Sequence, residues 1–285
     1  MTKVDIGIAC SNHQTSYWWA PLMGRLLNEQ SLGVDIQNIW AVSSAVPDHN
    51  KNNTIISGIA PPDQKRRNSL TDANRVTAVK RFLTAGSDWL FFIDDDTLPP
   101  VGAITKLLGH GRDFIAGLYY NTNPPYNPIA YMRREDGLYN PVYHFPYGAV
   151  MQVDAIGMGC TLIHRSVFER IMEEHTLYQR PNGSLAVVHS SCIYGDEDST
   201  TSGLRPKVWV SGGYMHTEVK QVDLTQEDTR AWPFYALEYG RTEDMHFCEL
   251  AANVGIRCWV DTTINCEHYK VKATTREEYK REANG

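Results

Sequence analysis

The chain has 285 residues, enough to bury a large core as one big α/β domain or as two fused halves. Its net charge of -6 excludes the strongly basic surface that is typical of a nucleic-acid binder. The first residues carry charge where a signal peptide needs an apolar run, and no stretch approaches the ~18 apolar residues of a membrane span. We therefore expect a cytoplasmic protein with no transmembrane segment and no nucleic-acid partner.

The six cysteines are scattered along the chain, and no Cys-x-x-Cys motif is present. This spacing indicates neither a zinc ribbon nor a dense disulfide framework. We expect reduced, partly buried thiols, which agrees with a cytoplasmic location.

Apolar runs and amphipathic stretches alternate in the first hundred residues. We expect strands at 4–10, 34–46 and 89–93, with helices over 18–27 and 71–83 between them. This alternation predicts a parallel sheet. The glycine motifs of dinucleotide-binding and P-loop proteins are absent, which excludes both classes. The first helix should bury these side chains: Trp18, Trp19, Leu22, Met23, Leu26 and Leu27.

The most informative stretch is the apolar run at 89–93, because three carboxylates follow it directly: Asp94, Asp95 and Asp96. Ligands of open α/β sheets bind beyond the carboxyl ends of the strands. Three adjacent acids repel one another, so a counter-charge is expected there, most simply a divalent metal ion. The alternative is a solvated acidic turn, since turns favour aspartate. We favour the metal site.

Arg75 lies early in the helix that leads to this acidic strand. An arginine at that place can hold a phosphate group. A solvated arginine is the competing interpretation, and the sequence leaves the two open.

Beyond residue 100 we expect a helix over 101–108, a strand over 114–120 and a longer strand over 154–163. The last of these carries Gly157 and Gly159. Glycines in such a setting permit a close backbone approach, either to a ligand or to a neighbouring strand.

The region from 175 to 230 is the least regular part of the sequence. Short alternating apolar residues at 207–210 predict an antiparallel hairpin. A second Asp-x-Asp at 196–198 is not delivered by an apolar strand, so we interpret it as a solvated loop. A last strand is expected at 256–260.

Two acids, Glu243 and Asp244, head a helix that follows Thr242. The positive end of the helix dipole favours negative charge there, so these acids either cap the helix or take part in chemistry. His268, near the end of the ordered part, is in isolation either a hydrogen-bonded histidine or a metal ligand.

The order of these motifs resembles that of the GT-A glycosyltransferases, particularly family 2-like enzymes, over roughly residues 4–269. The resemblance is tightest at 91–96, 156–159 and 242–248. It implies an α/β fold with a Rossmann-like, mostly parallel central sheet flanked by helices and a smaller antiparallel acceptor-side region.

The same resemblance divides the chain into two halves of one domain. Residues 1–100 would bind the nucleotide-sugar and residues 101–270 the acceptor. A polar tail at 271–285 would follow.

The resemblance also implies roles for individual residues. The Mn²⁺ or Mg²⁺ ligands would be Asp94, Asp96 and His268. Donor-binding residues would be Arg75, Asp94, Asp95, Gly157 and Gly159. The catalytic base would be Asp244, with Glu243 nearby.

These roles describe a metal-dependent transferase that moves a sugar from a UDP- or GDP-sugar to a hydroxyl of a glycan or another acceptor. Attack assisted by Asp244 would invert the anomeric centre, although a retaining outcome stays open. We expect the metal to bind weakly without nucleotide, because diphosphate oxygens complete its shell. Asp96 and His268 should then lie within about 10 Å of each other, since they share one ion.

Three other classes of protein fit the sequence less well. A haloacid-dehalogenase-type phosphatase would need Thr or Val where this chain has Leu98. A sugar-1-phosphate nucleotidyltransferase should show a glycine-rich, basic N-terminal motif, which is absent. A non-catalytic sugar-binding module is disfavoured by the intact set of acids and the late histidine.

Overall fold

The computed structural model describes residues 2–10, 19–42, 71–179, 185–189, 209–211, 214–216, 220–221, 234–235 and 242–269. Its helices within these ranges are α1 (Trp19–Ser31), α2 (Thr71–Ala85), α3 (Ala103–Gly109), α4 (Arg165–Glu174) and α5 (Glu243–Asn253). None of the helices in this part of the chain is long and apolar enough to cross a membrane.

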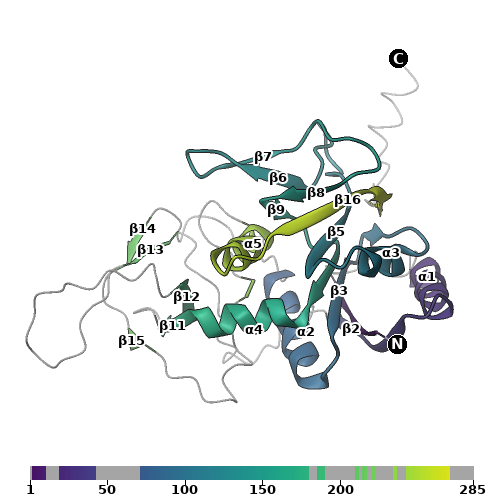
Figure 1. Cartoon of the computed structure of the whole chain (residues 1–285), viewed down its shortest axis with the longest axis horizontal. Helices are drawn as coiled ribbons and strands as arrows, with labels where there is room; N and C mark the ends of the chain where they lie inside the picture. Colours follow the sequence, from purple (N-terminus) through teal and green to yellow (C-terminus); the bar gives the residue numbers. More distant parts are fainter. Residues whose placement is uncertain are drawn as a thin grey trace, which may run out of the picture.

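A seven-stranded sheet lies at the centre of the structure (Figure 1). Its spatial order is β2 (Asp35–Val42), β1 (Lys3–Ala9), β3 (Trp89–Asp94), β10 (Cys160–His164), β5 (Phe114–Leu118), β16 (Cys258–Asn265) and β8 (Val150–Val153). The pairs β2–β1, β1–β3 and β5–β16 are parallel, and the other three neighbouring pairs are antiparallel.

The predicted α/β class is therefore confirmed, and so is the parallel unit of the first hundred residues. The sheet as a whole is mixed rather than mostly parallel, because β10 is inserted in the antiparallel direction between β3 and β5. Strands from both predicted halves of the chain contribute to it.

The structure also contains smaller antiparallel sheets, as expected. Their strands are β6 (Ala130–Arg133), β7 (Tyr139–Pro141) and β9 (Ala155–Ile156); β4 (Thr97–Leu98) and β17 (Glu267–His268); β11 (His175–Gln179), β12 (Leu185–His189) and β15 (Lys220–Gln221); and β13 (Trp209–Ser211) and β14 (Tyr214–His216). The β13–β14 pair confirms the hairpin predicted near 207–210.

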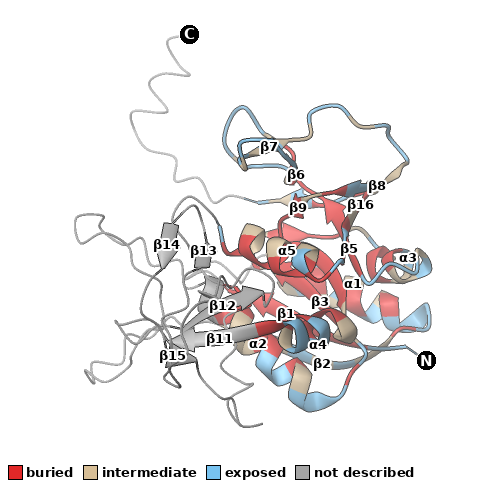
Figure 2. Ribbon diagram, turned by 60° about the vertical axis from the view of Figure 1, so that its left-hand side comes forward, coloured by how far each residue is buried: buried red, intermediate tan, exposed pale blue. Residues whose placement is uncertain are grey.

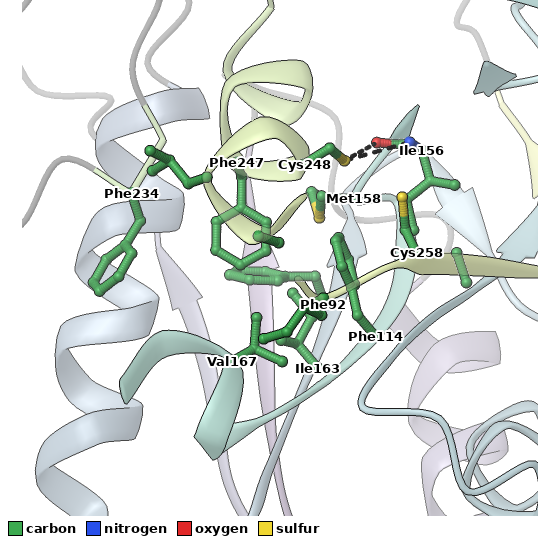
Figure 3. Close-up of a cluster of buried hydrophobic side chains, with 14 of the residues drawn as sticks. Phe92, Phe114, Ile156, Met158, Ile163, Val167, Phe234, Phe247, Cys248 and Cys258 are labelled. Carbon is green, nitrogen blue, oxygen red and sulfur yellow. Dashed lines mark hydrogen bonds between the residues drawn. The ribbon is translucent and has the colours of Figure 1, made fainter. Parts of the chain in front are cut away.

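Helices cover both faces of the central sheet and give two apolar cores. Side chains of α2, α4 and α5 form one core, and side chains of α1 and α3 form the other. Figure 2 shows the strands between them as a buried layer. In the first core, the ring centroid of Phe247 of α5 lies 5.4 Å from that of Phe114 of β5 (Figure 3). It lies 5.3 Å from the ring centroid of Phe168 of α4. Each such buried ring contributes roughly 1.5–3 kcal/mol of transfer free energy, which fixes α5 against the sheet.

Three details differ from the sequence-based expectation. Leu27 of α1 is 65% exposed, because the buried stripe of that helix passes through Leu22 and Leu26. The expected strand at 154–163 is split into β9 and β10, with the glycine segment between them. The expected last strand at 256–260 continues to Asn265 as β16, and β17 follows it.

The cysteines that the structure describes are free and buried: Cys10, Cys160, Cys248, Cys258 and Cys266. Several predictions concern residues outside the described ranges. These are Trp18, the acidic loop at 196–198 and the tail at 271–285.

Candidate active site

Strand β3 delivers the three acids to the edge of the sheet where parallel strands end. It is buried through Ile93 and ends at Asp94, and a turn at Asp95 and Asp96 follows. The short strand β4 then pairs with β17, which places His268 opposite Thr97 in the register. This pairing brings Glu267 and His268 back to the acidic turn.

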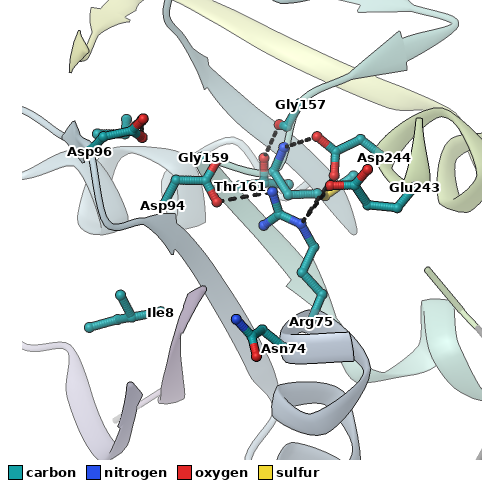
Figure 4. A network of polar contacts seen from close by, with 12 residues as sticks. Ile8, Asn74, Arg75, Asp94, Asp96, Gly157, Gly159, Thr161, Glu243 and Asp244 are labelled. Carbon is teal, nitrogen blue, oxygen red and sulfur yellow. Dashed lines mark hydrogen bonds and ion pairs between the residues drawn. The ribbon is translucent and has the colours of Figure 1, made fainter. Parts of the chain in front are cut away.

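Asp94 lies in a buried ion-pair cluster around Arg75 of α2 (Figure 4). The Arg75 side chain is only 2% exposed, and its Nη2 lies 2.9 Å from Asp94 Oδ1. Its Nε lies 3.2 Å from Asp244 Oδ1 and 4.0 Å from Glu243 Oε1. The guanidinium carbon lies 5.7 Å from the centroid of the Phe92 ring. Arg75 is therefore not the solvated arginine that one interpretation of the sequence allowed.

One guanidinium faces three carboxylates in this cluster, so negative charge is in excess. Burial raises the pKa of Asp94, and the pairing with Arg75 opposes this effect only in part. Burial, with the charges of Glu243 and Asp94, likewise raises the pKa of Asp244 to about 8, against the lowering effect of Arg75. Burial lowers the pKa of Arg75, but its carboxylate neighbours outweigh that and leave the pKa raised, so Arg75 stays charged. Asp244 therefore holds its proton more tightly than an ordinary aspartate does.

Asp244 is held by the first turn of α5 and by the glycine segment. The N-cap of α5 is Thr242, whose hydroxyl accepts a hydrogen bond from the Met245 backbone N–H at 3.4 Å. Asp244 instead accepts from the Met158 backbone N–H at 3.2 Å. Asp244 is therefore directed at another element rather than capping its own helix, and its side chain is 18% exposed.

Asp96 and His268 form a second, more open pair. His268 Nε2 lies 3.2 Å from Asp96 Oδ2, and the Asp96 side chain is 46% exposed. The expected proximity of these two residues is confirmed. Glu267, the neighbour of His268, pairs with Arg25 at 3.2 Å and stays outside this pair.

The other ring nitrogen of His268 fixes the state of the imidazole. Nδ1 lies 2.6 Å from the Tyr120 carbonyl oxygen, which can only accept, so Nδ1 carries the hydrogen. In the neutral ring Nε2 then presents a lone pair to Asp96. Burial lowers the pKa of His268, but the hydrogen bonds to Asp96 and the Tyr120 carbonyl outweigh it, and the pKa is raised.

The glycine segment at 157–159 is shaped by Tyr119. A Cβ on Gly157 would lie 2.1 Å from the Tyr119 hydroxyl, and one on Gly159 would lie 3.0 Å from Asp94 Oδ2. The Tyr119 hydroxyl accepts from the Gly159 backbone N–H at 3.1 Å, and its ring meets His268 edge-on at 5.4 Å. The glycines thus have a packing reason in the structure, and their role in donor binding stays a prediction.

Most of the residues predicted for the site are brought together. The exception is Asp95, which is 5% exposed and lies toward the end of β1, where its charge adds to burial in raising the pKa of Cys10 to about 11. Sequence reasoning missed Tyr119, the Met158 N–H and the Tyr120 carbonyl. Tyr119 and Tyr120 are the last two residues of the strand expected at 114–120, so the rule about strand ends could have indicated them.

No group of three or more His, Cys, Asp or Glu side chains that could hold a metal ion is present in the described residues. Asp96 and His268 nevertheless fit two positions of such an ion. Ligand bonds of about 2.0–2.1 Å at right angles separate two ligand atoms by about 3 Å, close to the 3.2 Å found here. A metal-binding histidine also usually donates its other N–H to a carbonyl or carboxylate, as His268 does.

No family model matches the chain, and no curated protein matches its sequence. Among solved structures it is similar to A197 from STIV, with a TM-score of 0.44 and 14% identity, over 95% of this chain and 87% of that one. It is also similar to a glycosyltransferase involved in the glycosylation of the major capsid of PBCV-1, with a TM-score of 0.29 and 8% identity, over 58% of this chain and 61% of that one. Because both TM-scores are below 0.5, an assignment of function depends on the site itself.

Proposed function

We propose that the chain is a metal-dependent glycosyltransferase that moves a sugar from a nucleoside-diphosphate donor to a hydroxyl of a glycan or other acceptor. One observation carries this proposal. The end of β3 holds two different acidic sites next to each other: the open Asp96–His268 pair and the buried Arg75 cluster that contains Asp244. Metal-dependent, inverting transfer from a nucleotide-sugar needs both a place for a cation and a base.

The Asp96–His268 pair is the place for the cation. A carboxylate oxygen and a histidine lone pair facing each other repel unless a proton or a metal ion lies between them. With two protein ligands, most of the coordination shell is left for water and diphosphate oxygens, as is usual for Mg²⁺ at phosphate sites. When bound, Mn²⁺ or Mg²⁺ would offset the charge that develops on the departing diphosphate.

Asp244 is the base in this proposal. The acceptor oxygen attacks the anomeric carbon, the bond from that carbon to the diphosphate oxygen breaks, and the nucleoside diphosphate leaves with the electron pair. The acceptor's proton passes to Asp244, whose pKa of about 8 makes its ionised form a stronger base than an ordinary aspartate. A single displacement of this kind inverts the anomeric centre. Glu243, at 4.0 Å from Arg75, is the next candidate for the base.

Donor binding tests the proposal without knowledge of the acceptor. Isothermal titration calorimetry with UDP, GDP and dTDP, each with and without MnCl₂, should show one nucleoside diphosphate that binds only in the presence of the metal. The control variant Asp136→Asn should bind the nucleoside diphosphate as the unmodified chain does, because Asp136 pairs with Arg134 on an exposed hairpin. Equal binding with and without Mn²⁺, or no binding of any of the three, would contradict the proposal.

A further inference from the structure

Asp94 and Asp96 are two residues apart, yet only Asp94 is paired with Arg75 (Figure 4), because Asp96 is paired with His268. Asp94 is 21% exposed and paired with buried Arg75, whereas Asp96 is 46% exposed and paired with His268. An Asp-x-Asp motif at a metal site would offer both carboxylates to the ion. Here one of the two is already bound to a protein cation.

Arg75 is itself held firmly in place. It is among the largest fully buried side chains, and it projects from a helix that packs against β1 and β2. Its Nη2 forms an ion pair with Asp94, and its Nε forms one with Asp244. Removing one partner from a buried ion pair leaves the other charge uncompensated, so Asp94 is strongly retained.

The backbone around Asp94 supports the same orientation. Its N–H donates to the Gly159 carbonyl at 3.3 Å, and its Oδ2 lies 3.0 Å from the place that a Cβ on Gly159 would occupy. The carboxylate thus lies in a slot that only glycine at 159 leaves open, on the Arg75 side of the turn.

We propose that Arg75 is a positioning residue that withholds Asp94 from the divalent metal. This inference rests on the proposed function, because it concerns the metal site assigned there. The nucleotide-free protein then offers the ion Asp96 and His268 alone, and Asp94 stays beside Asp244 in the buried cluster. The low number of protein ligands makes metal binding depend on the diphosphate.

The test measures Mn²⁺ affinity of the full chain without nucleotide, from the electron paramagnetic resonance signal of free Mn²⁺. Asp94→Asn should leave the affinity unchanged within error. Asp96→Asn and His268→Ala should each lower it at least roughly tenfold, since they remove a ligand. An equal loss in Asp94→Asn and Asp96→Asn would overturn the proposal, because Asp94 would then be a ligand.

Arg75→Met gives the complementary result. It frees Asp94 to turn toward the ion, so Mn²⁺ should bind about tenfold more tightly, a gain of the size that metal-site partners typically provide. Adding Asp94→Asn to Arg75→Met should abolish that gain. A folded Arg75→Met variant with unchanged affinity would also overturn the proposal.

If Arg75→Met does not fold, the comparison of Asp94→Asn with Asp96→Asn still shows whether Asp94 is a metal ligand. This readout needs no sugar transfer, so an inactive protein that shows the expected metal affinities would contradict the proposed function and leave the role of Arg75 standing. Absence of Mn²⁺ binding in every protein, with or without nucleoside diphosphate, would contradict the metal site and this inference together.

Discussion

The two ends of the Asp-x-Asp motif differ more from each other than their spacing suggests. Asp94 faces inward to a guanidinium that is 2% exposed, and Asp96 faces outward to an imidazole that is 19% exposed. Charges interact more strongly where water is excluded, so the inner cluster of Asp94, Arg75 and Asp244 is tightly coupled. In the outer pair of Asp96 and His268, a metal ion can take the place of the proton between the two side chains. The difference shows that the partner of an acidic side chain, more than its place in a motif, determines whether it forms an ion pair or can bind a metal.

Asp244→Asn should give the largest effect, because it removes the base from the inner cluster. Turnover should fall by about 10²–10⁴-fold, the usual range for a positioned acid–base group. Donor affinity should change little, although Asp244 shares Arg75 with Asp94 and is not independent of the donor side. Transfer rate and donor affinity of the variant provide the measurement.

Glu243→Gln is the matched control, since Glu243 is the adjacent acid and lies farther from Arg75, at 4.0 Å. It should retain most of the turnover. If Glu243→Gln is inactive and Asp244→Asn is active, the roles of the two acids are reversed.

Asp96→Asn should act on the outer pair alone. Metal-dependent binding of the nucleoside diphosphate should weaken by roughly 10–100-fold, because one of two protein ligands is replaced by a neutral amide. Calorimetry in MnCl₂ measures this loss, and Asp136→Asn, on the exposed hairpin, should show none. Donor binding that is insensitive to Asp96→Asn would contradict the assignment of the metal to the outer pair.

The pH dependence of transfer should report on the inner cluster. Burial raises the pKa of Asp244 to about 8, and only the ionised carboxylate accepts a proton. Below that value the rate should fall about tenfold per pH unit, and above it the rate should level off. A pH–rate profile with a flat response between about pH 6 and about pH 9 would contradict the assignment of Asp244.

Folding stability should move in the opposite direction with pH. The folded state holds the proton on Asp244 more tightly than the unfolded state, whose pKa is near 3.8. The stabilisation is full below 3.8 and is lost as the pH rises through about 8. Asp244→Asn mimics the protonated side chain, so the variant should lose less stability than the wild type between about pH 5 and about pH 9 in thermal unfolding.

Tyr119→Phe should give the smallest effect. Tyr119 lies between the two sites, since its ring contacts His268 and its hydroxyl binds Gly159 beside Asp94. The substitution removes the acceptor for the buried Gly159 N–H and should lower the free energy of unfolding by about 1–3 kcal/mol. Chemical denaturation measures the change, with Tyr126→Phe as the control because Tyr126 is 59% exposed. Equal stability of the two variants would show that the Tyr119 hydroxyl does not support the glycine segment.

Local patterns were sufficient to predict the strands and helices that lead to the site. The apolar run before Asp94, the amphipathic stretch around Arg75 and the acids after Thr242 each mark the start or end of an element. The end-of-strand rule then predicted where the acids gather. It could not predict that β10 lies antiparallel beside β3, because strand order depends on contacts between distant segments.

Partners of individual side chains were also beyond the reach of the sequence. The sequence leaves Arg75 to a phosphate or to solvent, but its carboxylate partners come from the next strand, β3, and from α5, which is distant in the chain. His268 was expected near Asp96, yet the carbonyl of Tyr120 that orients its ring comes from a third element. Such contacts follow from tertiary packing, which motif spacing does not encode.

Product analysis of donor turnover tests the central claim most directly. The full chain is incubated with UDP-, GDP- and dTDP-sugars and MnCl₂, with water or added glycans as acceptors and, in parallel samples, with pyrophosphate. The products are identified by mass spectrometry. We expect one donor to yield a nucleoside diphosphate and a transferred or released sugar, only with the metal, and not in Asp244→Asn. Conversion of a donor and pyrophosphate to a nucleoside triphosphate and a sugar-1-phosphate, or no turnover of any donor that binds, would contradict the account.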